Sequence, residues 1–244
     1  MSKLLFSGVL IVILLITTAG FAPVISPYDP SEQNLFEGLK GPGSKHILGQ
    51  DRLGRDILSR IIYGSRVSLQ VGIMAVGISL ILGLIIGSAS GYFGGFIDNL
   101  FMRIADILLA FPGILLAIGI TAVLGPSLTN VILALSIISW VGYARLIRGQ
   151  ILSVREYEYV SAARAIGAGD FRIITKHILP NIIAPVLIQA SFGMAGAITA
   201  EAGLSFLGLG TQPPIPSWGS MLNEGRNYLL VAPHLTICPG IAIM

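Results

Sequence analysis

Long windows of uncharged, apolar residues limit the folds open to this chain more than any other feature of its sequence does. A helix that crosses a membrane needs about 20 such residues, and the chain has several clear windows of this kind and a shorter, incomplete one. They cover about residues 4–25, 67–90, 100–124, 128–143, 180–209 and 228–244. Because the apolar runs are continuous and do not alternate with polar residues, they predict helices and not the strands of a barrel. The sequence therefore predicts an all-α, polytopic membrane protein.

Composition supports this class and excludes others. Charged residues make up 11% of the chain and hydrophobic residues 54%, whereas an average globular protein is about 25% charged. A formal net charge of +3 without a basic run does not indicate a nucleic-acid partner. The single cysteine, Cys238, excludes a disulfide framework within one chain, and the three histidines lack the spacing of metal ligands. We therefore exclude the soluble classes and expect neither a metal nor a cofactor in this chain.

The two ends of the chain need separate interpretation. The first window has a signal-peptide alternative, because small residues at Ala19 and Ala22 could form a cleavage site. Its apolar run is longer than the usual signal core of about 7–15 residues, so an uncleaved anchor helix is favoured. The last window is interrupted by Pro233 and Pro239 and has no charged flank. We expect this last helix to be truncated, with residues missing after Met244.

A polar stretch, residues 26–66, separates the first two windows. Its last part, residues 56–63, has the pattern of a short amphipathic helix that lies along the bilayer surface and leads into the second window. Its two faces carry Arg55, Ser59 and Arg60 on one side and Ile57, Leu58, Ile61 and Ile62 on the other. The run 41–45 lacks the spacer of a phosphate-binding loop and follows no strand. We therefore expect no ATP-binding motif in this chain, and no enzyme activity.

Glycines recur every four residues in the second window, with Gly83 and Gly87 securely inside it. On a helix this spacing makes a bare groove that another helix backbone can approach closely. Tight packing is favoured over a direct role in a substrate path.

Two carboxylates accompany the apolar windows and form a candidate intramembrane polar site. Asp106 follows Arg103 at helical spacing, so an interfacial ion pair explains it. Glu201 lies deep in the fifth window, where a carboxylate costs a few kcal/mol unless it faces a cavity or a partner. A functional or interhelical hydrogen-bonding role and a place near the far interface both remain open for Glu201.

The stretch 145–180 is polar yet helical in pattern. It predicts two short helices, 156–166 and 171–179, separated by a glycine elbow at 167–169. Asp170 is predicted to cap the second helix and Pro180 to end it. The small residues Ala162, Ala163 and Gly167 would let this compact protrusion fit a groove on another protein. An ordinary amphipathic loop helix is the alternative.

This stretch resembles the EAA loop of ABC-importer permeases. The match rests on Ser161-Ala162-Ala163, then Gly167, then Leu179-Pro180 at the family's spacing. Ser161 replaces the family's Glu, and His177 replaces its Ile. The resemblance implies a surface that couples the chain to an ATPase through Glu158, Ser161, Ala162, Ala163, Gly167, Asp170, Leu179 and Pro180.

Two longer stretches of sequence indicate which branch of this family the chain resembles. Residues 46–60 and 201–219 resemble the second permease subunit of dipeptide, oligopeptide and nickel importers. The resemblance implies a type I ABC importer (MetI-like) fold with six transmembrane helices. It also implies two parts, an anchor helix with an extracytoplasmic segment at 1–66 and a permease domain at 67–244, with the coupling loop at about 145–180. Lys and Arg divide almost equally between the two sides, so charge bias does not give the orientation. The resemblance places the N-terminus in the cytoplasm.

The implied function is a permease subunit of an ATP-driven importer of di- or oligopeptides in a prokaryotic cytoplasmic (inner) membrane. Its implied partners are a second, homologous permease subunit, two ABC ATPase subunits that bind the ATP and Mg, an extracytoplasmic solute-binding protein, and membrane lipid. A nickel importer of the same family is the alternative, since the ligand and the pathway-lining residues are not readable from one chain.

Two other classes of membrane protein are alternatives. An ion-coupled secondary transporter could use Glu201 and Asp106, but such proteins usually show internal repeats or broken helices, and we find no convincing repeat. An intramembrane enzyme would need a Gly-x-Ser-x-Gly elbow or a histidine pair for a metal, and neither is present in the sequence.

Overall fold

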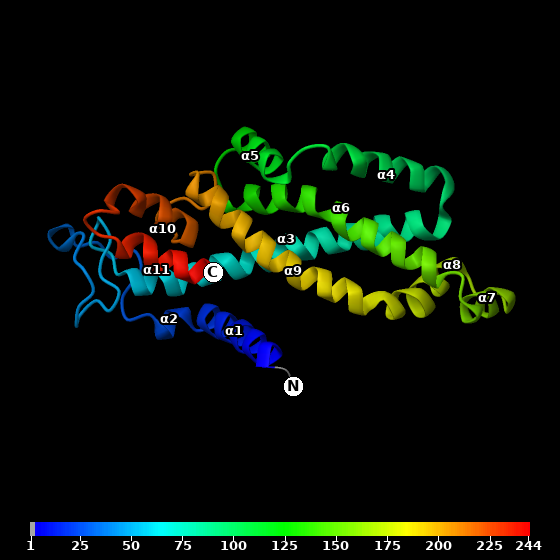
Figure 1. Cartoon of the computed structure of the whole chain (residues 1–244), viewed down its shortest axis with the longest axis horizontal. Helices are drawn as coiled ribbons and strands as arrows, with labels where there is room; N and C mark the ends of the chain where they lie inside the picture. Colours follow the sequence, from blue (N-terminus) through cyan, green and yellow to red (C-terminus); the bar gives the residue numbers. More distant parts are fainter. Residues whose placement is uncertain (1–2) are drawn as a thin grey trace. The chain divides into compact units, whose positions relative to one another are not determined.

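The computed structural model describes the backbone of residues 3–244 and the side chains from residue 8 onward. Throughout that range the regular structure is helical, and the one β-bridge, between Gln50 and Asp56, is isolated. The all-α prediction is confirmed. Figure 1 follows the chain from α1 (Lys3–Gly20) to α11 (His234–Ile243).

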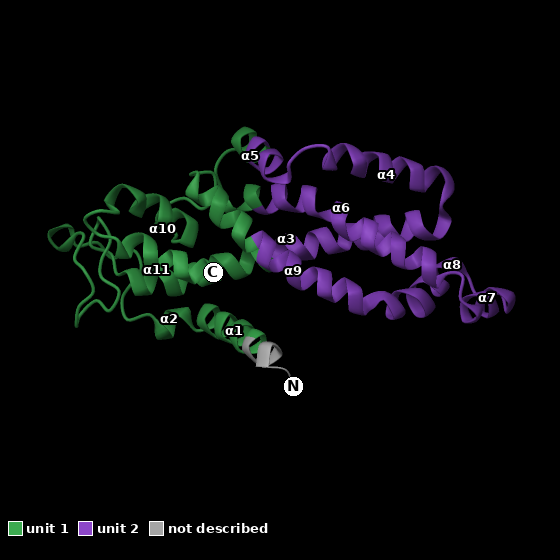
Figure 2. Cartoon of the chain, in the orientation of Figure 1, with its two compact units in different colours: residues 1–73, 120–131, 198–244 green, residues 74–119, 132–197 purple. Residues whose placement is uncertain are grey.

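The helices divide into two compact units, shown in Figure 2. Unit 1 contains residues 1–73, 120–131 and 198–244, and unit 2 contains residues 74–119 and 132–197. Several long helices begin in one unit and end in the other. Each unit is described by itself below.

Within the part of the chain that the structure describes, three helices are long and apolar enough to cross a membrane: α3 (Ile57–Phe93), α6 (Leu128–Val154) and the continuous helix Asp170–Phe206. A fourth span is possible if α4 (Gly95–Leu109) and α5 (Gly113–Leu124) count together, although they are bent by 87°. The apolar helices Gly8–Gly20 and His234–Ile243 are shorter.

The window 100–124, expected as one helix, is broken at Pro112. Proline has no N–H to donate and disfavours helical backbone in the residue before it, so the first helix ends at Leu109 and the second starts at Gly113. The first window is also interrupted, because α1 ends at Gly20 and a short α2 covers Ala22–Ile25.

Residues 57–63 are helical, as expected, but they form the first turns of the 37-residue α3 and not a separate surface helix. The prediction assumed that Ser59 and Arg60 face water. Both are buried, and their polar groups meet partners inside unit 1: Ser59 donates to Asp56 at 2.7 Å and Arg60 lies 3.2 Å from Asp51. Since these groups have protein partners, the helix does not need to turn its polar face to water.

Pro180 was expected to end a helix, and this is also wrong. The helix starts at Asp170, passes through a π-helical turn at Ile173–Ile178, and continues as α9 (Leu179–Phe206). A proline inside an α-helix clashes with the carbonyl group four residues before it, and a wider π turn relieves such a clash. The cap is Gly169, one residue before the predicted Asp170.

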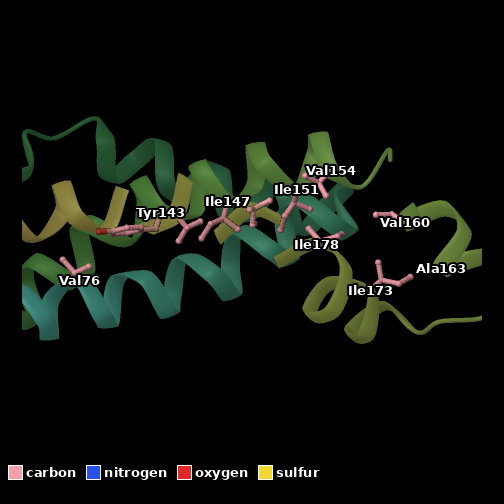
Figure 3. Packing of buried hydrophobic residues seen from close by; sticks show 11 residues of the cluster. Val76, Tyr143, Ile147, Ile151, Val154, Val160, Ala163, Ile173 and Ile178 are labelled. Carbon is pink, nitrogen blue, oxygen red and sulfur yellow. The ribbon is translucent and has the colours of Figure 1, made fainter. Parts of the chain in front are cut away.

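The core of unit 2 forms where α6 packs against α3. Tyr143, Ile147 and Ile151 of α6 are buried in it, as Figure 3 shows. A Cβ atom placed on Gly87 would lie 2.6 Å from the carbonyl oxygen of Ala144, and one on Gly83 would collide with Tyr143. The groove formed by Gly83 and Gly87 therefore receives α6 at backbone contact.

Unit 1 has an apolar cluster and a buried ionic network. The cluster contains Ile57 and residues of α10 (Trp218–Gly225) and α11. In the network Arg55 pairs with Asp51 at 2.6 Å and with Glu224 at 2.6 Å. The indole N–H of Trp218 also donates to the Ile61 carbonyl at 3.0 Å. These contacts hold the start of α3 against α10, a helix that the hydropathy pattern did not predict.

Candidate functional site

The candidate coupling surface is a protrusion, residues 155–178, that lies at one end of unit 2 in Figure 2. It begins after α6 and contains α7 (Glu158–Ala165), a glycine elbow and α8 (Asp170–Arg172). At the elbow the N–H of Ala168 donates to the Ala163 carbonyl and the N–H of Gly167 donates to the Arg164 carbonyl, both at 3.0 Å. This pair of bonds is a Schellman motif, which needs a left-handed residue. Gly167 supplies it with φ of +83°.

A small apolar interior makes the protrusion a packed body. Val160 and Ala163 of α7 are buried together with Ile173 and with Val154 at the end of α6, and Figure 3 shows these four side chains. Leu179 is half-buried and packs against the same cluster. Ala163, expected on the docking surface, therefore faces the interior, where its small side chain lets α7 approach the π-helical turn.

Two large apolar side chains of the protrusion are exposed. Ile166 and Phe171, on either side of the elbow, are 86% and 81% exposed. Several other residues expected at the site are also exposed, namely Glu158, Ser161, Ala162, Gly167, Asp170 and Pro180. The apolar side chains of Ile166 and Phe171 are therefore open to contact with a partner.

Three side chains attach the protrusion to the end of α3. The Tyr92 hydroxyl donates to Asp170 at 2.6 Å. Arg164 donates to that hydroxyl at 3.4 Å, a contact that raises the pKa of Arg164, and its guanidinium lies 5.8 Å from the centre of the Tyr92 ring. Arg155 donates to the Gly91 carbonyl at 3.0 Å. The protrusion is thus joined by covalent bonds to α6 and α9, and by side chains to α3.

Just before the protrusion, two arginines of α6 hold α4. Arg148 makes a two-pronged pair with Asp98, at 2.5 and 2.6 Å, a geometry that guanidinium and carboxylate groups favour. Arg145 pairs with Asp106. The expected Arg103 partner of Asp106 is therefore wrong, because Arg103 is exposed and the carboxylate is directed at the neighbouring helix.

Glu201 lies in unit 1 and is fully buried. Its carboxylate accepts a hydrogen bond from Ser205 at 2.5 Å, and the Ser205 oxygen accepts one from the Thr211 N–H at 3.2 Å. This chain of bonds connects α9 with the loop that follows it. Asp106 belongs to unit 2, where it pairs with Arg145.

Sequence reasoning missed Tyr92, Arg155 and Arg164. Tyr92 lies just after the apolar window 67–90, where an aromatic residue is common and does not indicate a function. The two arginines belong to a stretch that contains many other charged residues. Only their contacts across more than 60 positions of chain identify them. Across residues 8–244 no group of three or more His, Cys, Asp or Glu side chains could hold a metal ion.

Two family models match the chain. Residues 55–244 match the inner membrane component of binding-protein-dependent transport systems. Residues 2–42 match the N-terminal transmembrane domain of oligopeptide transport permease C.

Curated relatives cover almost the whole chain. A dipeptide transport system permease protein, DppC, of Alkalihalophilus pseudofirmus is 46% identical and is matched over 100% of this chain and 80% of its own length. A glutathione transport system permease protein, GsiD, of Pectobacterium atrosepticum is 45% identical, over 96% and 78%. A putative peptide transport system permease protein of Brucella suis is 47% identical, over 97% and 79%.

A solved structure shows the same fold. A chain of the MetNI methionine ABC transporter, in inward-facing conformations, superposes with a TM-score of 0.62 at 19% identity, covering 77% of this chain and 89% of that one. The fold is therefore MetI-like, as expected. With a family model that covers most of its length and relatives that match it nearly end to end, the chain belongs to the family of inner membrane components of binding-protein-dependent transport systems.

Proposed function

We propose that this chain is the permease subunit of an ATP-driven importer of di- or oligopeptides, and that the protrusion couples it to separate ATPase subunits. One observation carries the coupling role: Ile166 and Phe171 are exposed on a body whose shape is fixed by its own core and by the Gly167 elbow. Peptide cargo is supported by the relatives named for dipeptide, peptide and glutathione transport.

The proposed topology has six transmembrane helices and a cytoplasmic N-terminus. The spans are α1, α3, the bent pair α4 and α5, α6, α9 and α11. Residues 1–66 form the anchor and the extracytoplasmic segment, and residues 67–244 form the permease domain. Counting crossings from the N-terminus places the protrusion in the cytoplasm and α10 outside, which agrees with a protrusion that meets ATPases.

The coupling mechanism follows from how the protrusion is attached. ATP and Mg²⁺ bind to the two partner ATPases, whose closure moves the protrusion as a rigid body. Because α6 and α9 enter the protrusion directly and Tyr92 and Arg155 fasten α3 to it, three helices move together. The helices thereby pass between inward- and outward-facing arrangements.

Other partners complete the importer. Many large apolar side chains of the spans are exposed in the single chain, among them Ile81 and Ile85 of α3 and Leu187 and Ile188 of α9. A second, homologous permease subunit and membrane lipid would cover them, and an extracytoplasmic binding protein would deliver the cargo. A nickel importer remains the alternative within this family.

The test is reconstitution of the whole importer in proteoliposomes, with Ile166→Ser and Phe171→Ser compared with Leu207→Ser. Leu207 is similarly apolar and 55% exposed, and it lies outside the protrusion. The two protrusion variants should insert normally but lose ATP-dependent uptake of a labelled dipeptide and copurify less ATPase, whereas Leu207→Ser should keep both. Chemical labelling of a cysteine at position 166 from the exterior of intact cells would contradict the proposal.

A further inference from the structure

A polar pocket in unit 1 has no role in the coupling mechanism. It has a volume of about 300 Å³ and lies between Arg52, the loop after α9 and one face of α10. This volume is at the lower end of the range for small-molecule sites, about 300–1,000 Å³. In the proposed topology the pocket belongs to the extracytoplasmic side, from which an importer receives its cargo.

The negative charge at the pocket wall is already compensated. The Glu224 carboxylate accepts from Arg55 at 2.6 Å and from Arg60 at 3.4 Å, and Asp51 pairs with the same two arginines at 2.6 and 3.2 Å. The negative charges of the two carboxylates are therefore balanced by the positive charges of the two guanidinium groups. The remaining charge at the pocket is the positive charge of Arg52.

Several polar side chains of the pocket have no partner among the residues whose side chains are described. Arg52, Asn223 and Asn227 make no side-chain hydrogen bond or ion pair there. Thr211 is only 4% exposed, and its hydroxyl oxygen also has no partner. Because this oxygen is enclosed by protein atoms, the groups left open to a bound molecule are those of Arg52, Asn223 and Asn227.

The pocket has little apolar lining. Pro213 and the ring of Tyr228 supply its main apolar surface, and the other side chains present amide, hydroxyl or charged groups. Such a lining recognises hydrogen-bonding groups and charge. It therefore fits a ligand whose common part is polar and whose variable part points away.

We propose that this pocket binds the carboxyl-terminal end of a short peptide. The planar guanidinium of Arg52 pairs with the terminal carboxylate, which it fits with two parallel hydrogen bonds. The carboxamides of Asn223 and Asn227 donate to and accept from the peptide bond. This inference rests on the proposed peptide cargo and assigns it a receiving site that ignores side-chain identity.

The test measures equilibrium binding of radiolabelled dialanine to the importer complex in lipid nanodiscs, without the binding protein. Dialanine amide, which lacks the carboxylate, is the second probe. Arg52→Gln should weaken dialanine binding about tenfold, a change of about 1.4 kcal/mol, and leave the weaker binding of the amide unchanged. Asn223→Ala should weaken both probes. Arg66→Gln, which removes an exposed cation outside the pocket, should change neither.

Two results would overturn the site. One is equal binding of dialanine and its amide, or unchanged dialanine binding by Arg52→Gln. The other comes from a second measurement, the affinity of the nanodisc complex for its binding protein: an Arg52→Gln defect confined to that affinity would make this face a protein-docking surface. The proposed function is tested separately by uptake in the wild-type importer. If the wild-type importer takes up no peptide but binds dialanine in a way that depends on Arg52, the proposed function is rejected and the proposed binding site is retained.

Discussion

The protrusion and the segment that precedes α3 are both polar in sequence, yet they are stabilised in opposite ways. The protrusion has a core of apolar side chains, including Val160 and Ile173, and exposes apolar residues at its surface. The segment before α3 and the first turn of α3 bury charge instead, with Arg55 and Arg60 enclosed between Asp51 and Glu224. A surface built to be covered can expose apolar groups, whereas a buried ionic network fixes one arrangement of its partners.

The sharpest test of this contrast is Arg60→Ala. Arg60 is 1% exposed, and its loss leaves Asp51 and Glu224 with less compensation inside the protein. Removing one partner of a buried ionic network costs about 3–5 kcal/mol, so the unfolding temperature of the purified subunit should fall strongly. Lys40→Ala, which removes the exposed pair with Glu37, should leave it unchanged. Equal changes of the unfolding temperature in Arg60→Ala and Lys40→Ala would mean that the buried network contributes no more stability than an exposed ion pair.

The next test separates the inside of the protrusion from its outside. Ile173→Ala empties a buried site, and such truncations cost about 2–5 kcal/mol, so it should lower the unfolding temperature. Phe171→Ala, two positions away and 81% exposed, should leave stability unchanged but weaken copurification of the ATPases. A stability loss in Phe171→Ala would show that its side chain belongs to the core.

Gly167 tests whether the shape of the elbow matters for coupling. A branched residue in left-handed backbone costs about 1–2 kcal/mol, and a Cβ atom at this position meets no neighbour within 4 Å. Gly167→Val should therefore let ATP hydrolysis continue while dipeptide uptake falls. Gly167→Asn, which tolerates this backbone, should retain uptake. Equal uptake in the two variants would count against the elbow.

The smallest expected effect concerns Tyr92. Tyr92→Phe removes the hydroxyl that donates to Asp170, and a hydrogen bond contributes about 0.5–1.5 kcal/mol net. A double-mutant cycle with Asp170→Asn should give a coupling of this size, and each variant should hydrolyse more ATP per dipeptide imported. Strictly additive effects in the unfolding free energy would exclude a direct interaction.

Hydropathy predicted the helical class because apolar windows are a local property. It missed the full length of α3, since Ser59 and Arg60 look like surface residues until their partners at Asp56 and Asp51 are known. It ended a helix at Pro180, because the wider turn that accommodates this proline depends on backbone geometry that residue type does not reveal.

The sequence predicted the position of the protrusion and its glycine elbow, but not which side chains form its interior and its attachments. The elbow at Gly167 follows from local sequence, because few residues other than glycine accept that backbone. The burial of Ala163 and the role of Tyr92 do not, since both depend on which segments meet in space. The ion-pair partner of a side chain also cannot be read from sequence spacing alone. Asp106 has an arginine at helical spacing, yet it pairs with Arg145 of another helix.

The π-helical turn at Ile173–Ile178 has a mechanical consequence. An α-helix resists bending through its regular ladder of backbone bonds, and a π turn followed by a proline interrupts that ladder. The resistance of the helix Asp170–Phe206 to bending is therefore lowest at residues 173–180. A force applied to the protrusion would change its angle to α9 by a small amount while α6, α9 and the end of α3 are displaced together.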